Sequence, residues 1–338
     1  MMGAKVTSQQ VAERAGVSRS AVSRVFTPGA SVSAATAERV RAAADALAYR
    51  PNVLARSLIT GQSRIIGLVV AYLDNLFYPE ALEHLSKTLQ ARGYHVLVFM
   101  AGNKQGEVQG VIDELLDYQV DGIIAASVGM SNDLTTRCEA AGIPIVLFNR
   151  TQDDPRLSAV VSDNFAGGRA LAEFLLAGGH RRIGYIAGWE GASTQRDREA
   201  GFRAGLAAQG RDIAVRAVAD FDLDRARDAA RTMCADQPPD AIFVANDHMA
   251  FAVMDVLRFE LGLAVPGDIS VVGYDDVQLA AWPAYNLTTV RQPARQMVEQ
   301  TVQILMDRLL GTERTPQHIT LPGALRIRGS ATLPKDIT

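Results

Sequence analysis

Short apolar runs separated by amphipathic stretches recur along the chain from residue 65 onward. The runs read "IIGLVVAY", "HVLVFMA", "DGIIAAS", "PIVLFN", "RIGYIAG", "AIFVAN" and "DISVVGYDD". Continuous apolar strands that alternate with helices predict parallel sheets covered by helices on both faces. Two sets of such units meet near residues 161–163. The pattern therefore predicts an α/β body of two similar lobes, and 338 residues leave room for a further domain.

Charge is distributed unevenly between the beginning of the chain and the rest. Residues 1–64 carry nine Lys and Arg against three Asp and Glu, a net +6, whereas the whole chain carries −3 and the remainder therefore −9. A basic head on an acidic body suits a protein that neutralises phosphates with one end only. A chance imbalance of surface charge is the alternative.

The segment "TSQQVAERAGVSRSAVSRVF" predicts two short helices joined by a sharp turn. Thr7 or Ser8 is placed to cap the first helix, Gly16 to make the turn and Ser18 to cap the second helix. A third helix begins after Ser33 and closes a small apolar core. Two helices joined in this way form a helix-turn-helix, whose second helix enters the major groove of DNA.

The candidate DNA-contacting residues of this head domain are Thr7, Ser18, Arg19, Ser20, Ser23 and Arg24. Either arginine can form a bidentate contact with guanine or hold a phosphate, and the sequence leaves both roles open.

The stretch "YRPNVLARSLITGQSR" is too apolar for an ordinary solvent-exposed linker. Pro51 can begin a helix, but two turns of helix are too short to be stable alone in water. Paired with its twin over a minor groove, the helix can insert Leu58 between base steps. The candidate contacts of this hinge are Asn52, Ala55, Arg56 and Leu58. An inert linker with accidental leucines is the alternative.

In order and spacing, these motifs resemble those of the lactose-repressor/galactose-repressor (LacI/GalR) family. The resemblance rests on "VAERAGVSRSAVSRVF", "YRPNVLARSL", "SDNFAGGRALAEFLLAGGHRRIGYIAG" and "VANDHMAFAVMDVLRFELGLAVPGDISVVGYDD". It implies a DNA-binding transcriptional regulator, in most cases a repressor, that binds a pseudo-palindromic operator as a homodimer. It also implies two Rossmann-like lobes resembling periplasmic binding proteins, with a small effector between them. One departure is "FTPGASVS", where many members have a shorter turn.

The domain boundaries expected on this basis are a helix-turn-helix domain at 1–50, a hinge at 51–64 and a body at 65–338. Within the body, the expected N-lobe comprises about 65–162 and 293–322, and the expected C-lobe about 163–292 and 323–338.

Polar residues at strand ends are the candidate effector ligands, because open parallel sheets bind ligands at the carboxyl ends of their strands. Asp74 and Asn75 follow the first strand. By resemblance the set continues with Phe77, Asp163, Arg198, Phe221, Asn246 and Asp275. Carboxylates, an amide and a guanidinium around an aromatic ring favour a carbohydrate-like effector. Ordinary structural roles also stay open: a helix cap for Asp247, a loop hydrogen bond for Asp276 and a surface ion pair for one of Arg196 and Arg198.

Other classes of protein find little support. No segment reads as a signal peptide or an 18-residue membrane span, so we expect a cytoplasmic protein without membrane association. No GxGxxG, Walker, HExxH or GxSxG motif occurs, and the histidines lack metal-ligand spacing, so we expect neither an enzyme, a cofactor nor a metal. The tail "SATLPKDIT" lacks the leucine heptads of a tetramerising coiled coil. The rival interpretation is a periplasmic-type sugar-binding protein without a DNA role, which has no use for residues 1–64.

Overall fold

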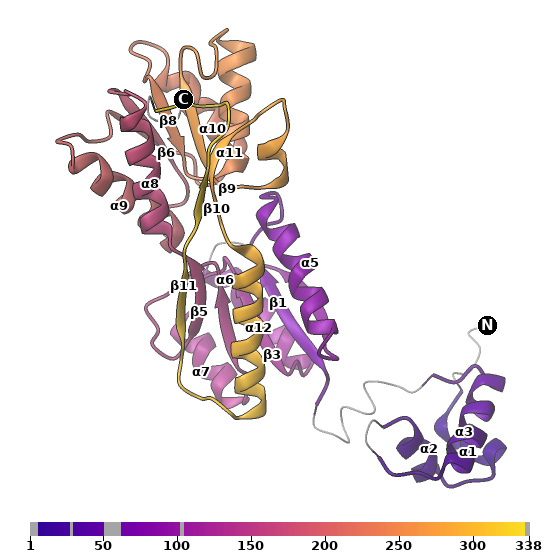
Figure 1. The fold of residues 1–338 in the computed structure, drawn as a ribbon. Helices are drawn as coiled ribbons and strands as arrows, with labels where there is room; N and C mark the ends of the chain where they lie inside the picture. The colour runs from indigo at the N-terminus through magenta and orange to yellow at the C-terminus, as the bar shows by residue number, and fades with distance from the viewer. Residues whose placement is uncertain (1–5, 28–29, 51–61, 102–104, 335–338) are drawn as a thin grey trace. The chain divides into compact units, whose positions relative to one another are not determined.

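A computed structural model describes residues 6–27, 30–50, 62–101 and 105–334, with only the backbone described at 105–107. The chain forms two compact units, Met1–Ser63 and Arg64–Thr338 (Figure 1). Among the described residues, no helix is both long and apolar enough to cross a membrane.

The N-terminal unit is a small three-helix bundle. Its helices are α1 (Ser8–Ala15), α2 (Arg19–Val25) and α3 (Ala34–Ala46). The predicted caps are confirmed, because the Oγ atoms of Thr7, Ser18 and Ser33 each accept a hydrogen bond from a backbone N–H in the first turn of their helix. Gly16 ends α1 in the left-handed conformation, at φ 64°, which glycine adopts without strain. The buried core consists of Val11, Ala12, Ala15, Val22, Val40, Ala43 and Ala44.

The body contains two sheets, each six-stranded among the described residues. In the first sheet the order is β11-β5-β4-β3-β1-β2, and all paired strands are parallel. Its strands are β1 (Ile65–Val70), β2 (His95–Met100), β3 (Gly122–Ala126), β4 (Ile145–Phe148), β5 (Ser158–Ser162) and β11 (His318–Leu321).

The second sheet repeats this order as β12-β10-β9-β8-β6-β7, with β12 antiparallel to β10 and the other pairs parallel. Its strands are β6 (Ile183–Ala187), β7 (Val215–Val218), β8 (Ala241–Val244), β9 (Ser270–Asp275), β10 (Thr288–Arg291) and β12 (Ala324–Arg326). The predicted class of α/β body with parallel sheets is therefore confirmed.

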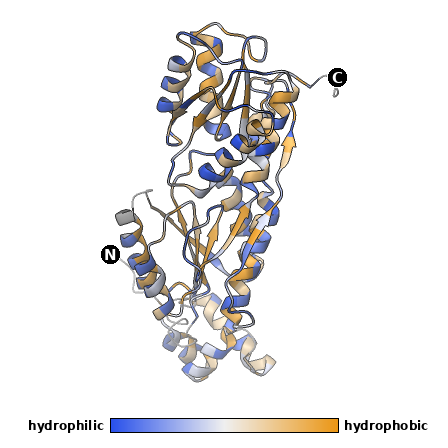
Figure 2. Cartoon of the chain, turned by 90° about the vertical axis from the view of Figure 1, so that its left-hand side faces the viewer, coloured by the Kyte–Doolittle hydropathy of each residue, from blue (hydrophilic) through white to orange (hydrophobic). Residues whose placement is uncertain are grey.

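Helices cover both sheets, and the strands between them are largely apolar (Figure 2). The first lobe has α5 (Phe77–Gln90), α6 (Gln105–Asp117), α7 (Asn132–Ala140) and α12 (Ala294–Leu310). The second has α8 (Asn164–Ala177), α9 (Ser193–Ala207), α10 (Leu223–Met233), α11 (Asp247–Asp255) with a π-helical turn (Val256–Glu260), and a 3-10 turn (Gln278–Ala281).

The chain crosses between the lobes three times: between β5 and α8, between β10 and α12, and between β11 and β12. In each sheet the strand order reverses beside the first strand of its lobe, between β1 and β3 and between β6 and β8. Such switch points are where open α/β sheets bind ligands.

Candidate cleft between the lobes and candidate nucleic-acid interface

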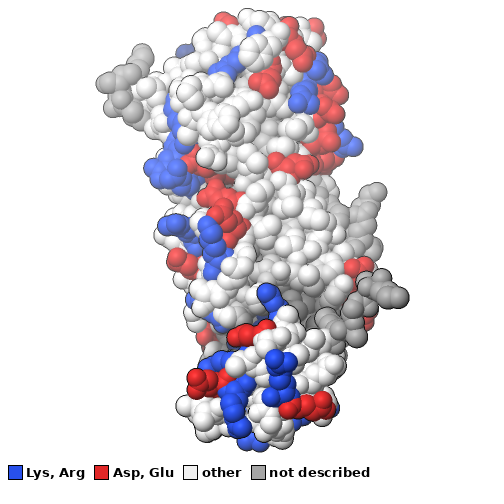
Figure 3. Space-filling view, turned by 90° about the vertical axis from the view of Figure 1, so that its right-hand side faces the viewer, with Lys and Arg blue, Asp and Glu red and all other residues white. Residues whose placement is uncertain are grey.

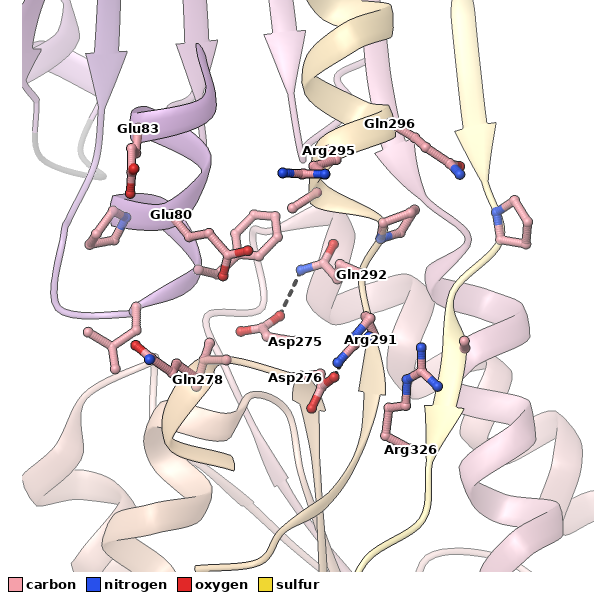
Figure 4. Close-up of a pocket in the computed structure, with 18 residues that line it drawn as sticks. Glu80, Glu83, Asp275, Asp276, Gln278, Arg291, Gln292, Arg295, Gln296 and Arg326 are labelled. Atoms are coloured by element: carbon pink, nitrogen blue, oxygen red, sulfur yellow. Dashed lines mark hydrogen bonds and ion pairs between the residues drawn. The ribbon is translucent and has the colours of Figure 1, made fainter. Parts of the chain in front are cut away.

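Asp275 lies at the end of β9 and joins the two lobes. Its buried carboxylate accepts hydrogen bonds from Asn75 Nδ2 at 2.9 Å and from Gln292 Nε2 at 2.7 Å, the latter drawn in Figure 4. Arg198 Nη2 donates to the same carboxylate at 3.4 Å. Asn75 follows β1 in the first lobe, whereas Arg198 lies on α9 in the second. The side chain of Asp275 therefore depends on both lobes for its partners.

Arg198 is held by its own lobe. Its guanidinium donates to Asn164 Oδ1 at 2.9 Å and to the carbonyl of Ala245 at 2.7 Å, and it stacks on the ring of Tyr274 at 3.8 Å from the centroid. A buried guanidinium needs such partners because burying an unpaired charge is unfavourable. Arg198 is consequently pre-positioned beside Asp275.

Close packing of α8 against α9 fixes the position of Arg198, which lies on α9. A Cβ added to Gly201 would lie 1.9 Å from the carbonyl oxygen of Phe165, and one added to Gly168 would lie 2.1 Å from the carbonyl oxygen of Arg198. Only glycine permits the two backbones to approach this closely.

Several polar atoms of the cleft are buried without a hydrogen-bond partner among the described residues. Asn246 caps α11 by accepting from Met249 N at 2.9 Å, which leaves its Nδ2 unpartnered. Asn149 donates from Nδ2 to the hydroxyl of Tyr78 at 3.1 Å, which leaves its Oδ1 unpartnered. Gln292 Oε1 is also buried and has no hydrogen-bond partner among the described residues. Unpaired buried polar atoms are rare, so these atoms indicate a place for a polar ligand.

Aromatic rings approach each other across the cleft. Tyr72 of the first lobe and Phe221 of the second have ring centroids 6.2 Å apart, tilted by 30°. Phe221 adopts a positive φ of 63°, and a Cβ at Gly188 would lie 2.1 Å from its ring. Burial raises the pKa of the Tyr72 hydroxyl well above its usual range. The two rings provide apolar surface beside the polar cluster.

Further along the cleft, Arg150 at the end of β4 lies over the ring of Trp189, which follows β6 in the other lobe. The guanidinium carbon is 5.3 Å from the ring centroid. Beside this pair, the backbone N–H of Thr151 donates to Ser193 Oγ at 2.9 Å, again from one lobe to the other.

Asp247 is a structural neighbour of the cleft. Its carboxylate accepts from Val277 N at 3.0 Å and from Thr289 Oγ1 at 2.6 Å. Burial, reinforced by the nearby charge of Asp275, raises the pKa of Asp247. The expected helix cap is wrong for Asp247, because the cap of α11 is Asn246.

Two cavities flank the cleft. One, of about 990 Å³, lies between the start of α5, the start of α12 and the ends of β9 and β10 (Figure 4). The other, of about 900 Å³, lies on the opposite side and is lined by Gly129, Met130, Thr151, Gln152, Asp153, Trp189, Gly191, Arg196, Asp220, Asp222 and Arg225.

The structure brings Arg198, Asn246 and Asp275 together at the cleft, with Phe221 at its edge. Two other candidates have structural roles: Asp163 is half-buried and caps α8 by accepting from Ala166 N at 2.9 Å, and Phe77 is buried.

The Phe77 ring packs against Tyr78 and Phe148, so it belongs mainly to the core, although it also borders the 990 Å³ cavity. Asp74 is exposed. Arg196 is exposed and donates to the carbonyl of Gly191 at 3.0 Å. Asp276 forms ion pairs with Arg291 and Arg328, so its role is more than a loop hydrogen bond.

Several cleft residues were not predicted from the sequence. Six of them lie at the end of a strand or just after it, which is the signal that should have selected them. They are Tyr72, Ser127, Asn149, Arg150, Trp189 and Gln292, whereas Tyr78 lies in the first turn of α5 and carries no such signal.

On the N-terminal unit, the predicted recognition helix is α2, and it presents Arg19, Ser20, Ser23 and Arg24 as exposed side chains. Ser18 is exposed as well, and its hydroxyl lies 3.0 Å from that of Ser20. A positively charged, hydroxyl-bearing helix surface can bind both phosphates and base edges. The hinge candidates Asn52, Ala55, Arg56 and Leu58 lie outside the described residues.

Comparison with known proteins agrees with both parts of this arrangement. Residues 7–52 match the bacterial regulatory proteins of the lacI family, and residues 172–331 match the periplasmic binding protein-like domain. The transcriptional regulator CelR of Thermobifida fusca is 34% identical over 334 residues, which cover 96% of this chain and 98% of CelR. The chain belongs to the LacI family.

Other LacI-family relatives agree over nearly the full length. The ribose operon repressor of Escherichia coli K12 is 30% identical over 96% of this chain and 99% of its own. The lac repressor dimer bound to operator and the anti-inducer ONPF superposes with a TM-score of 0.87, at 30% identity, over 97% of this chain and 99% of the other. A CelR–cellobiose complex superposes with a TM-score of 0.73, at 32% identity, over 96% of this chain and the whole of the other. The chain is therefore a DNA-binding transcriptional regulator.

Proposed function

We propose that this LacI-family regulator is a repressor whose affinity for operator DNA is set by a carbohydrate-like effector bound between its two lobes. One observation carries the proposal: the buried polar atoms of Asn149, Asn246 and Gln292 lack partners at the place where the lobes meet around Asp275. A ligand that supplies these hydrogen bonds stabilises the lobe arrangement that forms them.

The chemistry of this site favours a polyhydroxylated ligand. The amide groups of Asn246 and Asn149 pair with hydroxyls, and the rings of Tyr72 and Phe221 cover apolar faces. Two relatives also favour a carbohydrate, because a CelR structure contains cellobiose and the Escherichia coli relative is named as the ribose operon repressor.

The proposed mechanism is thermodynamic linkage between the cleft and the DNA-binding unit. An effector that prefers one orientation of the lobes changes the spacing of the two hinge segments in a dimer, and hence their ability to pair on DNA and insert Leu58. Operator DNA must then alter effector affinity by the same factor. In this scheme residues 1–50 bind DNA, 51–64 form the hinge, and 65–338 bind the effector and dimerise, with lobes of about 65–162 plus 293–322 and 163–292 plus 323–338.

Exposed apolar side chains support dimerisation through the body. Val98 and Met100 lie on the edge strand β2, and Trp282 and Phe259 are exposed on the second lobe, Phe259 by 81%. Figure 3, which faces the side of the body that carries α5, shows a broad area with few charged side chains. Two recognition helices are needed because half-sites of a pseudo-palindromic operator lie about 34 Å apart.

The experiment begins with selection of an operator sequence from a random DNA library by the full-length protein. Fluorescence anisotropy then measures operator affinity with and without each sugar of a panel. We expect at least one sugar to change operator affinity in the wild type but not in Asp275→Asn, which keeps DNA binding.

Asp212→Asn is the matched control, since Asp212 is an exposed carboxylate paired with Arg203 on the surface. This variant should respond like the wild type. A normal response in Asp275→Asn would contradict the assignment of the cleft. A body that bound sugar while the full-length protein showed no salt-sensitive affinity for DNA would instead support the periplasmic-type alternative, which the LacI-family match at residues 7–52 does not favour.

A further inference from the structure

Arg150 is a buried cation without a hydrogen-bonding or ion-pair partner among the described residues. The residue is 4% exposed, and its Nε and Nη1 are both buried and unpartnered. Its contact is the face of Trp189, which leaves the N–H groups at the edge of the guanidinium free. Arg198, a second cation of the same cleft, donates to Asn164, to a backbone carbonyl and to a carboxylate. Of these two arginines, Arg150 is therefore the one without such partners.

Carboxylates of the cleft and of the loop after β4 bind other groups. Asp275 accepts from three donors, and Asp154 forms an ion pair with Arg156 at 2.7 Å. Asp247 bonds to Val277 and Thr289. Because burial raises the pKa of Asp247, this group adds less negative charge to the cleft at neutral pH than an ordinary carboxylate would.

We infer that the effector carries an anionic group, a carboxylate or a phosphate, that pairs with Arg150 at the junction of the lobes. The inference rests on the proposed function and narrows its ligand from carbohydrates in general to acidic ones. Neutral hydroxyls satisfy hydrogen bonds but leave a buried charge uncompensated, whereas the planar fork of an arginine matches a carboxylate or phosphate with two parallel bonds.

The position of Arg150 allows a ligand to reach it. The next residues, Thr151 and Gln152, line the cavity of about 900 Å³, and so does Trp189. Of the three carboxylates of that cavity, Asp220 pairs with Arg225, Asp222 caps α10 and Asp153 is exposed to solvent. The anionic group is therefore expected beside Arg150 and Trp189, with the rest of the effector extending toward Asn246 and Asp275.

Matched pairs of ligands test the inference on the full-length protein. Calorimetry would compare glucose with glucuronate and glucose 6-phosphate, galactose with galacturonate, and ribose with ribose 5-phosphate. We expect at least one acidic member to bind tenfold or more tightly than its neutral partner, and the acid and phosphate arms distinguish the two anion classes. In Arg150→Met this preference should disappear, whereas the exposed Arg211→Met should retain it.

A second measurement does not depend on choosing the right sugar. Removing an uncompensated buried cation should raise the melting temperature of the unliganded protein by a few degrees in Arg150→Met, and inorganic phosphate should stabilise the wild type more than this variant. Equal stabilisation by phosphate together with a lower melting temperature would overturn the inference. A neutral sugar that binds at least as tightly as its acid would also overturn the inference. If the binding of that neutral sugar required Asp275, the proposed function would still be supported.

Discussion

Asn75 and Asp275 are 200 residues apart in the sequence and share a hydrogen bond of 2.9 Å between the two lobes. Asn75 also accepts from the backbone N–H of Phe77 through Oδ1, so its amide can present only Nδ2 to Asp275. The start of α5 thereby determines the orientation of the Asn75 amide, and this orientation allows the hydrogen bond from Nδ2 to Asp275.

Asn75→Asp is expected to open the unliganded cleft. The substitution keeps an oxygen for Phe77 but sets a carboxylate against that of Asp275, and a buried charged group left without a partner costs more than the roughly 1–3 kcal/mol of a neutral one. Small-angle scattering should show a larger radius of gyration than the wild type, with partial recovery at low pH as the carboxylates are protonated. Ser193→Ala, which removes the separate bond to Thr151, should have a smaller effect. Identical scattering from Asn75→Asp and the wild type would contradict this role.

Gly201→Ala should destabilise the body, because the added methyl group meets the carbonyl of Phe165. Overpacking of this kind costs about 1–3 kcal/mol and should lower the melting temperature by several degrees. Gly110→Ala is the matched control: Gly110 is also helical, but a Cβ there meets no atom within 4 Å. Calorimetry should find this variant as stable as the wild type or slightly more stable.

Asp247 gives the body a pH dependence of known sign. Because burial raises its pKa in the folded state, this carboxyl binds more protons in the native state than in the unfolded chain, and its contribution to the free energy of unfolding falls as pH rises from about 4. Asp247→Asn mimics the neutral form and should flatten this fall in urea titrations at a series of pH values. Substitution of the exposed Asp236 by Asn should leave the pH profile unchanged; a profile equally steep in Asp247→Asn would refute the assignment.

Arg19→Ala and Arg24→Ala should separate base recognition from phosphate binding, the two roles that the sequence leaves open. Loss of a phosphate contact weakens binding to all DNA sequences and reduces the slope of log affinity against log salt by about 1. Loss of a guanine contact costs about 1–3 kcal/mol and relaxes the preference at one operator position. Anisotropy titrations over a range of salt, with operator variants, distinguish these outcomes. Wild-type binding by both variants would remove α2 as the recognition helix.

The strands could be predicted where their runs are almost wholly apolar. Runs such as "GIIAA" of β3 are apolar throughout, and each predicted run contains a strand of the structure. In contrast, the strands β5 ("SAVVS"), β7 ("VRAV"), β10 ("TTVR"), β11 ("HITL") and β12 ("ALR") were missed. A strand of three to five residues that includes polar side chains carries little signal in the sequence.

The candidate site could be predicted only in part, for geometric reasons. Strand ends identify where a ligand binds, but adjacent aromatic residues on a helix point in different directions: Phe77 enters the core while the Tyr78 hydroxyl bonds to Ser127 and Asn149. Likewise, Arg150 and Arg198 both lie near strand or helix ends, and the structure is needed to see that one is fully partnered and the other is not.

Strand β1 is an interior strand of its sheet, paired with the edge strand β2 on one side and with β3 on the other. Its carboxyl end leads to Tyr72 and Asn75 at the cleft, and its amino end, Ile65, follows directly on the segment from the DNA-binding unit. Six residues of extended chain span about 20 Å and, clamped on both sides, neither stretch nor bend easily. Under the proposed mechanism, an effector that shifts the carboxyl end of this strand would also shift its amino end, where the chain leads to the DNA-binding unit.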